Sequence, residues 1–233
     1  METTSLLSVL KRHATDFHNV VPFDPARTRL YAFDFTEHNK ELTTDQIADT
    51  HLFAGYINRA LQQHHAQYGI GGYGEHRTLY ARSGHFNGVA EPRRLHLGID
   101  IWAPAGTAVM SPLDGIVHSF AFNNNDSDYG ATLILTHNLG GIGFHTLYGH
   151  LSLNSLKNLS EGKNIRKGEV IAEFGMRFEN GNWPPHLHFQ VIADMQGWKG
   201  DYPGVAAFSE RHRWLDNCPD PDLILQMMQY AKK

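Results

Sequence analysis

The segment PHLHFQVI at residues 185–192 decides the fold that the sequence predicts. Successive side chains of a β-strand point to opposite faces of a sheet. In a strand, Leu187, Phe189 and Val191 would therefore form one apolar face, and the two histidines of the segment would share the other. In a helix, residues two positions apart diverge by about 200°, so the histidines could not work as a pair. The segment predicts a strand that presents two histidines on one face.

Short β-branched and aromatic runs precede this segment. They occupy residues 107–110, 115–122, 131–136, 143–148 and 169–174, and turn signals such as Asp114-Gly115 and Gly140-Gly141 separate them. Several short strands with such turns are typical of an antiparallel sandwich or a barrel-like sheet. We therefore predict a mainly β core over residues 90–195.

Helix signals occur on both sides of this core. Thr43 and Gln46 have the spacing of a capping box. Apolar residues at helical spacing follow them to about Tyr68, where a glycine-rich run ends the pattern. Near the other end of the chain, Asp220-Pro221 has the form of a helix start, and the apolar residues after it predict a C-terminal helix.

The chain shows no internal repeat and no Gly/Ser-rich linker. We expect one compact unit with three parts. A helical N-terminal region at residues 1–89 would pack on the core at residues 90–195, and residues 196–233 would form a tail that contains the C-terminal helix.

The composition excludes several classes of protein. The chain has 233 residues and a net charge of −4, which argues against a nucleic-acid-binding surface. Because there is no run of eighteen apolar residues and no secretory signal pattern, we expect no membrane span and a cytoplasmic or non-classically exported protein. The single cysteine, Cys218, excludes an intrachain disulfide and a zinc site built on several thiolates.

Histidine is abundant, with 16 residues, so short histidine patterns carry little weight alone. Both His-x-His and His-x-x-x-Asp are expected about once by chance in such a chain. The pattern HLGID at residues 96–100 would put His96 and Asp100 on one face of a strand. HRWLD at residues 212–216 has the same spacing but lies outside the predicted core, and we interpret it as a chance occurrence.

Two such strands side by side could place three ligands around one cation. Three nitrogen and oxygen ligands with an open fourth position are typical of a catalytic zinc site. Such a site activates water and polarises a carbonyl oxygen. Neighbouring histidines could take the proton and stabilise the resulting oxyanion. The sequence has no His-Glu-x-x-His, so the base need not be a carboxylate.

A series of motifs resembles the lysostaphin/LytM-type zinc metallopeptidases, peptidase family M23. In order along the chain they are HLGID (96–100), PAGT (104–107), LDGIV (113–117), YGHL (148–151), IRKG followed by VIA (165–172) and PHLHF (185–189). The order makes the set far more specific than any one motif. The resemblance implies a two-sheet antiparallel β sandwich with the site in a groove.

The resemblance also implies roles for individual residues. His96, Asp100 and His188 would be the ligands of one Zn²⁺ per chain. His150 and His186 would be a catalytic pair that orients water and stabilises the tetrahedral intermediate. The implied activity is hydrolysis of a peptide bond, and the implied partner is a peptide or peptidoglycan fragment containing glycine or D-amino acids.

The sequence departs from the family pattern at residues 180–185, where NGNWPP replaces a smaller segment. Trp183 would either narrow the groove or pack beneath it. Glu75 and Arg77 would either line the groove or form a structural ion pair. The flanks at residues 73–77 and 202–204 resemble a branch of the family that occurs inside larger proteins, which suggests association with other enzyme modules.

Two alternatives remain at this point. A phosphohistidine carrier of the glucose-specific phosphotransfer type has a related sandwich and an H-x-G-I-D segment, but its histidines handle phosphate without a metal. PHLHF and YGHL favour the peptidase. The other alternative is a binding module that holds zinc without turnover.

Overall fold

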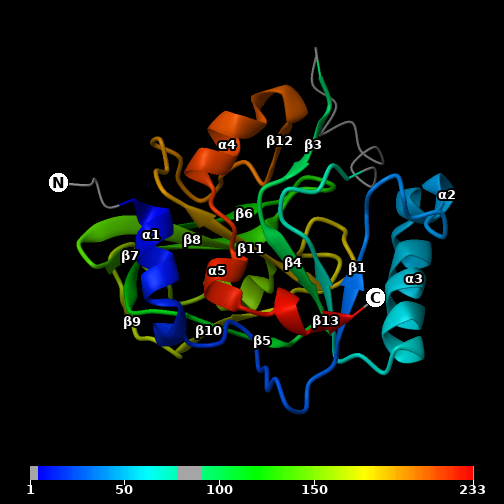
Figure 1. Cartoon of the computed structure of the whole chain (residues 1–233), viewed down its shortest axis with the longest axis horizontal. Helices are drawn as coiled ribbons and strands as arrows, with labels where there is room; N and C mark the ends of the chain where they lie inside the picture. Colours follow the sequence, from blue (N-terminus) through cyan, green and yellow to red (C-terminus); the bar gives the residue numbers. More distant parts are fainter. Residues whose placement is uncertain (1–4, 78–90, 233) are drawn as a thin grey trace.

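The largest element of the chain is a mixed β-sheet. A computed structural model describes residues 5–77 and 91–232, and within them nine strands form this sheet in the order β13-β1-β2-β4-β11-β8-β7-β6-β9 (Figure 1). The strands are β1 (Leu30–Phe33), β2 (Tyr68–Gly71), β4 (Ile99–Trp102), β6 (Gly115–Asn123), β7 (Gly130–Leu139), β8 (Ile142–Leu151), β9 (Asn164–Ile165), β11 (His186–Ile192) and β13 (Ala231–Lys232).

Two small sheets accompany the large one in the described part of the chain. β5 (Ala108–Met110) pairs with β10 (Val170–Glu173), and β3 (Arg93–His96) pairs with β12 (Val205–Ala207). The protein is mainly β, as predicted. The described strands form one large mixed sheet and two small ones, and β1 runs parallel to both β2 and β13, so the predicted two-sheet antiparallel sandwich is confirmed only in its mainly β character. No sequence pattern indicated this pairing, because these strands come from the flanking regions.

Strand β11 lies at the centre of the sheet, and its sequence explains its place. Leu187, Phe189 and Val191 are fully buried in the main core, as the alternation predicted. β11 pairs antiparallel with β4 on one side and with β8 on the other. This register sets His188 opposite both Asp100 and Gly149, so the strand brings three segments of the chain together.

The N-terminal helix prediction is correct at its start and wrong in its length. Thr43 and Gln46 form the predicted capping box at the start of α2 (Thr44–Ala48). Asp49 then ends α2 and caps α3 (Thr50–Gln63), because its carboxylate accepts hydrogen bonds from the first backbone N–H groups of α3. The segment after α3 forms β2 rather than helix, since its backbone pairs with β1 and β4.

The C-terminal helix is also much shorter than predicted. α5 (Asp222–Leu225) ends at Gln226, whose φ of 51° is left-handed. The Asp222 carboxylate accepts hydrogen bonds from the backbone N–H groups of Met227 and Met228 at 2.8 and 3.0 Å, which satisfies the donors after the turn. Of the apolar residues that suggested a longer helix, Ile224 and Met227 are buried in the core at this turn, whereas Tyr230 is exposed.

The remaining helices lie around the sheet (Figure 1). α1 (Leu6–Arg12) contacts β8 and α5, whereas α3 contacts β2 at the other end of the sheet. The others are α4 (Arg211–Asn217) and the 3₁₀ turns η1 (Ala14–Asp16), η4 (Leu153–Leu156), η5 (Phe208–Glu210) and η6 (Met228–Tyr230). Among the described helices, none has the length and apolar character needed to cross a membrane.

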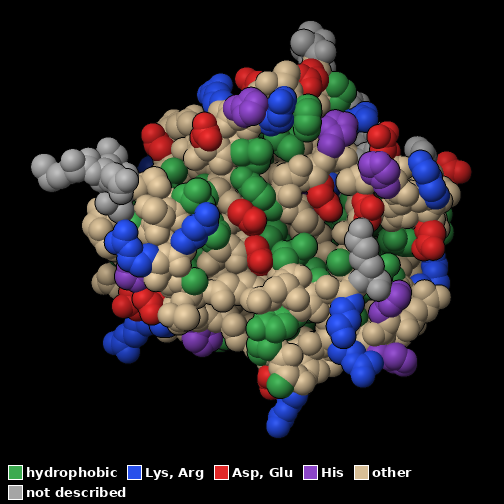
Figure 2. All heavy atoms as spheres, viewed as in Figure 1, with side chains coloured by type: hydrophobic (Ala, Val, Ile, Leu, Met, Phe, Trp, Pro, Cys, Tyr) green, Lys and Arg blue, Asp and Glu red, His purple; other side chains and the backbone are tan. Residues whose placement is uncertain are grey.

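The flanking regions extend the core sheet. β1 and β2 come from residues 1–89, and β13 comes from residues 196–233. The predicted boundary at 89/90 lies outside the described residues, and the division into three parts stays a prediction. On the face shown in Figure 2, basic and acidic side chains are scattered among apolar ones, with no single basic patch on that face.

Candidate metal centre and active site

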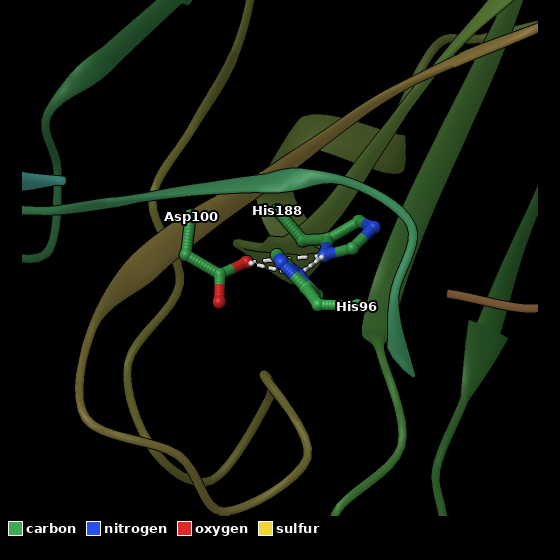
Figure 3. A group of neighbouring side chains, drawn as sticks. All are labelled: His96, Asp100 and His188. Atoms are coloured by element: carbon green, nitrogen blue, oxygen red, sulfur yellow. Dashed lines mark hydrogen bonds and ion pairs between the residues drawn. The ribbon is translucent and has the colours of Figure 1, made fainter. Parts of the chain in front are cut away.

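Three predicted residues meet where β3, β4 and β11 come together. His96 ends β3, Asp100 lies in β4 and His188 lies in β11 (Figure 3). The sequence suggested that His96 and Asp100 share one face of a single strand, but they lie on two different strands. The chain turns at Leu97 and Gly98 between two strands of different sheets, and this turn brings the two side chains together.

The facing atoms of these side chains form a small triangle (Figure 3). His96 Nε2 lies 3.1 Å from His188 Nδ1, and Asp100 Oδ1 lies 3.0 Å from His188 Nδ1 and 3.3 Å from His96 Nε2. Zinc with tetrahedral bonds of about 2.0–2.2 Å needs ligand atoms about 3.3–3.6 Å apart. All three residues are buried. The donor set and its spacing therefore fit a zinc ion to within a few tenths of an ångström.

The other nitrogen of each histidine is held by a neighbour. His96 Nδ1–H donates to the carbonyl oxygen of Gly72 at 3.0 Å, and His188 Nε2–H donates to Gln190 Oε1 at 2.9 Å. The Gln190 amide is oriented in turn, because its nitrogen donates to the carbonyl of Pro203 at 3.1 Å. Such contacts fix the tautomer of a metal-binding histidine. Each ring therefore presents its remaining nitrogen to the centre.

The glycine of HLGID has a steric reason. A Cβ at Gly98 would lie 2.5 Å from His188 Cε1, closer than any ordinary contact. Any larger residue would push the His188 ring out of position. The close approach of the turn to the ring therefore depends on glycine at this position.

His150 and His186 lie beside this centre. Their ring centroids are 4.1 Å apart with planes inclined by 31°, and both residues are buried. His150 Nδ1–H donates to the carbonyl of Asn180 at 2.9 Å, and His186 Nδ1–H donates to that of Pro184 at 2.8 Å. These bonds leave Nε2 as the nitrogen with the lone pair on each neutral ring.

The backbone at His150 is unusual for a strand. Its φ is 63°, in the left-handed region, where histidine occurs more often than most residues other than glycine. Non-glycine residues in such conformations often cluster at functional sites. The conformation interrupts the alternation along β8, so strand periodicity alone could not have given the direction of this side chain.

Burial and neighbouring charges set the ionisation of the site. Burial lowers the pKa of His96 and of His186 to about 4, and for His96 the Arg77 guanidinium acts in the same direction. Burial, followed by the neighbouring His186, lowers the pKa of His150 well below its usual value. Although burial opposes ionisation of Asp100, nearby His96 and Arg77 hold the pKa of this carboxyl well below its usual range. Neutral imidazoles and an ionised carboxylate are the forms that bind a metal.

A cavity of about 280 Å³ opens in front of these residues. Its lining includes Asp100, the histidines at 150, 186 and 188, and the aromatic residues Trp102, Tyr129, Trp183, Trp198 and Tyr202. Trp183 both lines this cavity and packs on Phe53, with ring centroids 6.5 Å apart. Trp102 stacks on the His186 ring at 4.0 Å, so His186 lies between Trp102 and His150.

Sequence reasoning missed several contacts of the site. Gln190 could have been found, because it follows His188 by two positions on the same strand and shares its face. Trp102 follows Asp100 in the same way. The Gly72 carbonyl has no sequence signal, because it comes from a segment that seemed to end a helix. Arg77 forms the ion pair with Glu75 that was one of its two predicted roles, with a distance of 2.9 Å, and it also contacts Asp100.

The second His-x-x-x-Asp pattern differs from the first in burial and in secondary structure. His212 and Asp216 are exposed on α4. Among the described residues, His96, Asp100 and His188 make up the one group of three or more His, Cys, Asp or Glu side chains placed to hold an ion.

The fold and site define a mainly β protein with a buried His-Asp-His centre and two further histidines that line an aromatic cavity. Residues 94–199 match the model of peptidase family M23, so the resemblance is confirmed for this segment of the chain. The chain is 39% identical to the DD-carboxypeptidase/endopeptidase Mpg of Neisseria meningitidis serogroup B over 98 residues, which is 42% of this chain and 20% of that protein.

Other relatives share this limited coverage. An uncharacterised metalloprotease of Haemophilus influenzae is 34% identical over 97 residues, or 42% of this chain and 18% of the relative. The chain thus spans about a fifth of the length of the curated relatives it matches. Among solved structures, a zinc-containing peptidase from Vibrio cholerae is 31% identical, covering 42% of this chain and 27% of its own, with a TM-score of 0.34. Lysostaphin from Staphylococcus simulans is 24% identical, covering 69% and 50%, with a TM-score of 0.43.

Proposed function

We propose that this chain is a zinc-dependent metallopeptidase that hydrolyses a peptide bond. The observation that carries the proposal is the triangle of His96 Nε2, Asp100 Oδ1 and His188 Nδ1, inside the segment that matches peptidase family M23. These atoms would hold one zinc ion. When bound there, zinc supplies Lewis-acid activation of water and of the scissile carbonyl.

His150 and His186 perform the proton transfers in this proposal. Both rings are neutral at pH 7 because burial lowers their pKa values, and Nδ1–H of each is fixed on a backbone carbonyl. Nε2 of one ring takes a proton from the attacking water as the new C–O bond forms. The protonated ring, whose Nε2–H can now donate, stabilises the oxyanion of the tetrahedral intermediate and then gives this proton to the departing amine as the C–N bond breaks. The other ring, still neutral, orients the attacking water by accepting a hydrogen bond at Nε2.

The substrate in this proposal is a peptidoglycan-type peptide, or one that contains glycine or D-amino acids. The name of the Neisseria relative, a DD-carboxypeptidase/endopeptidase, supports this class. The aromatic lining of the cavity would hold an extended chain and exclude water from the reacting bond. We also propose that the chain acts in association with other enzyme modules, as the sequence resemblance suggested.

Metal content and hydrolysis together test this function. We expect one zinc per chain in protein purified without a metal-binding tag, and cleavage of Gly-Gly or D-amino-acid peptides that a chelator abolishes. Absence of metal after zinc is supplied would contradict the proposal. Bound zinc without hydrolysis of any such substrate would favour a binding module instead.

A phosphohistidine carrier is less well supported by the geometry. The buried Asp100 carboxylate contacts His188 at 3.0 Å, and a carboxylate in this position attracts a cation and repels phosphate. Phosphorylation of a histidine by a phosphotransfer partner, in protein without metal, would reverse this preference.

A further inference from the structure

Arg77 lies outside the segment that matches the family, yet its side chain contacts a proposed zinc ligand. We propose that Arg77 is a positioning residue that fixes the Asp100 carboxylate for the metal. This inference rests on the proposed function. It makes the N-terminal region part of the metal centre.

The two oxygens of Asp100 have different partners, and the Arg77 guanidinium binds one of them. Nη1 of Arg77 donates to Oδ2, whereas Oδ1 is the oxygen that faces His96 and His188. Nε donates to Glu75 Oε2 at 2.9 Å, and Arg77 is fully buried. A planar guanidinium can bind two carboxylates in a fixed geometry. The carboxylate is thus held so that one oxygen remains for the cation.

The chain around Arg77 is built to hold it there. Gly71 of β2 lies opposite Asp100 in the sheet, and a Cβ at Gly71 would come within 2.6 Å of Arg77 Nη2. The following segment runs beside β3, where the N–H of Arg77 donates to the Arg94 carbonyl at 2.9 Å. The guanidinium also lies over the ring of Phe35, with Arg77 Cζ 5.2 Å from the ring centroid. These contacts leave the guanidinium little freedom.

Two possible roles of Arg77, through its charge and through the position of Asp100, predict opposite effects on zinc affinity when Arg77 is replaced. The inference is therefore testable. Glu75, Arg77 and Asp100 form a chain of charges with one net negative charge beside the proposed ion. If Arg77 acted through charge alone, its removal would leave two carboxylates near the site and would strengthen cation binding. If Arg77 acts by positioning, its removal weakens zinc binding.

The experiment measures zinc affinity on the full chain by competition with a chromogenic chelator. Losing a contact to a metal ligand typically costs about 10–100-fold in affinity, and we expect this loss for Arg77→Met. Arg77→Lys keeps the charge but cannot bridge both carboxylates, so we expect a loss of the same sign. Gly71→Ala should also weaken binding, since it displaces the guanidinium while every charge remains.

Arg213→Met is the matched control. Arg213 also pairs with a glutamate, Glu210, at 3.7 Å, but this pair is exposed at the start of α4 and neither residue lines the cavity. We expect its zinc affinity to equal that of the parent. The visible absorption spectrum of the Co²⁺-loaded protein gives a second readout, because a changed ligand geometry shifts the bands whereas a purely structural role leaves them unchanged.

The outcomes separate this inference from the proposed function. Unchanged or tighter zinc binding in folded Arg77→Lys and Gly71→Ala would overturn the positioning role and leave the metallopeptidase proposal intact. If Arg77→Met does not fold, these two variants decide alone. A parent chain that binds no zinc would overturn both.

Discussion

Two groups of histidines lie on the sheet strands and differ in their surroundings. His96 and His188 have a buried carboxylate between them, and each has its outer nitrogen held by an oxygen acceptor. His118 on β6 and His145 on β8 also lie close, with ring centroids 5.0 Å apart, but they are only partly buried. Their Nδ1 atoms contact the hydroxyls of Ser119 and Thr136 at 2.7 and 3.0 Å. The comparison indicates that a third ligand with fixed partners, rather than histidine proximity, makes a metal centre.

Removal of the carboxylate should have the largest effect. Asp100→Ala should lose bound zinc and hydrolysis almost completely, because only two neutral imidazoles remain as ligands and the buried Arg77 loses one of its carboxylate partners beside the site. His145→Ala is the control from the second group and should keep its zinc within error. Elemental analysis and peptide hydrolysis on both variants check this. Equal zinc content in the two variants would remove the distinction between the groups.

His150 should be needed for turnover but not for metal binding. General acid–base catalysis typically contributes about 10²–10⁴-fold, so His150→Ala should lose rate by that order while zinc affinity stays close to that of the parent. His145 precedes it by five positions on the same strand and again supplies the control. If His150→Ala loses zinc as well, His150 belongs with the ligands and its proposed role is wrong.

The sequence predicted which residues lie together in the site better than it predicted the strands and turns that position them. Local motifs named His96, Asp100, His150, His186 and His188. In the structure the last four line one cavity, and His96 contacts Asp100 and His188 beside it. The alternation in β11 was enough to predict a strand with paired histidines.

What the sequence could not give are the contacts between distant segments. The parallel pairing of β1 with β13 joins the two ends of the chain, and neither end carries a pattern that specifies the other. The carbonyl of Gly72 that binds His96 is a backbone group, which every residue has, so residue type could not predict this contact. The glycine-rich run after α3 indicates a break in the helix equally well whether a turn or a strand follows.

His145, from the second histidine group, should make the free energy of unfolding depend on pH. Burial, followed by the charge of His118, lowers the pKa of His145 to about 4 from an unfolded value near 6.5. The unfolded chain therefore binds a proton in this range before the folded protein does. The contribution of His145 to stability is present above about pH 6.5 and is lost as the pH falls towards 4.

Urea unfolding of the zinc-free protein between pH 4 and 7 measures this effect. One proton corresponds to a slope of at most about 1.4 kcal/mol per pH unit, and partial exposure of the ring makes the real contribution smaller. His145→Gln should flatten the slope by that amount or less. An unchanged slope would show that His145 titrates alike in the folded and unfolded states.

The smallest effect is expected at the second His-x-x-x-Asp pattern. On α4, residues four apart share a face, so His212 and Asp216 also lie near each other, and spacing alone does not separate this pair from His96 and Asp100. The difference is that both side chains are exposed and belong to no group of three ligands in the described chain. His212→Ala combined with Asp216→Ala should change stability by no more than about 0.5 kcal/mol per substitution and leave zinc content at one per chain. A second zinc in the parent that this double variant loses would show that an exposed pair on a helix suffices, and burial with a third ligand would no longer explain the contrast between the two patterns.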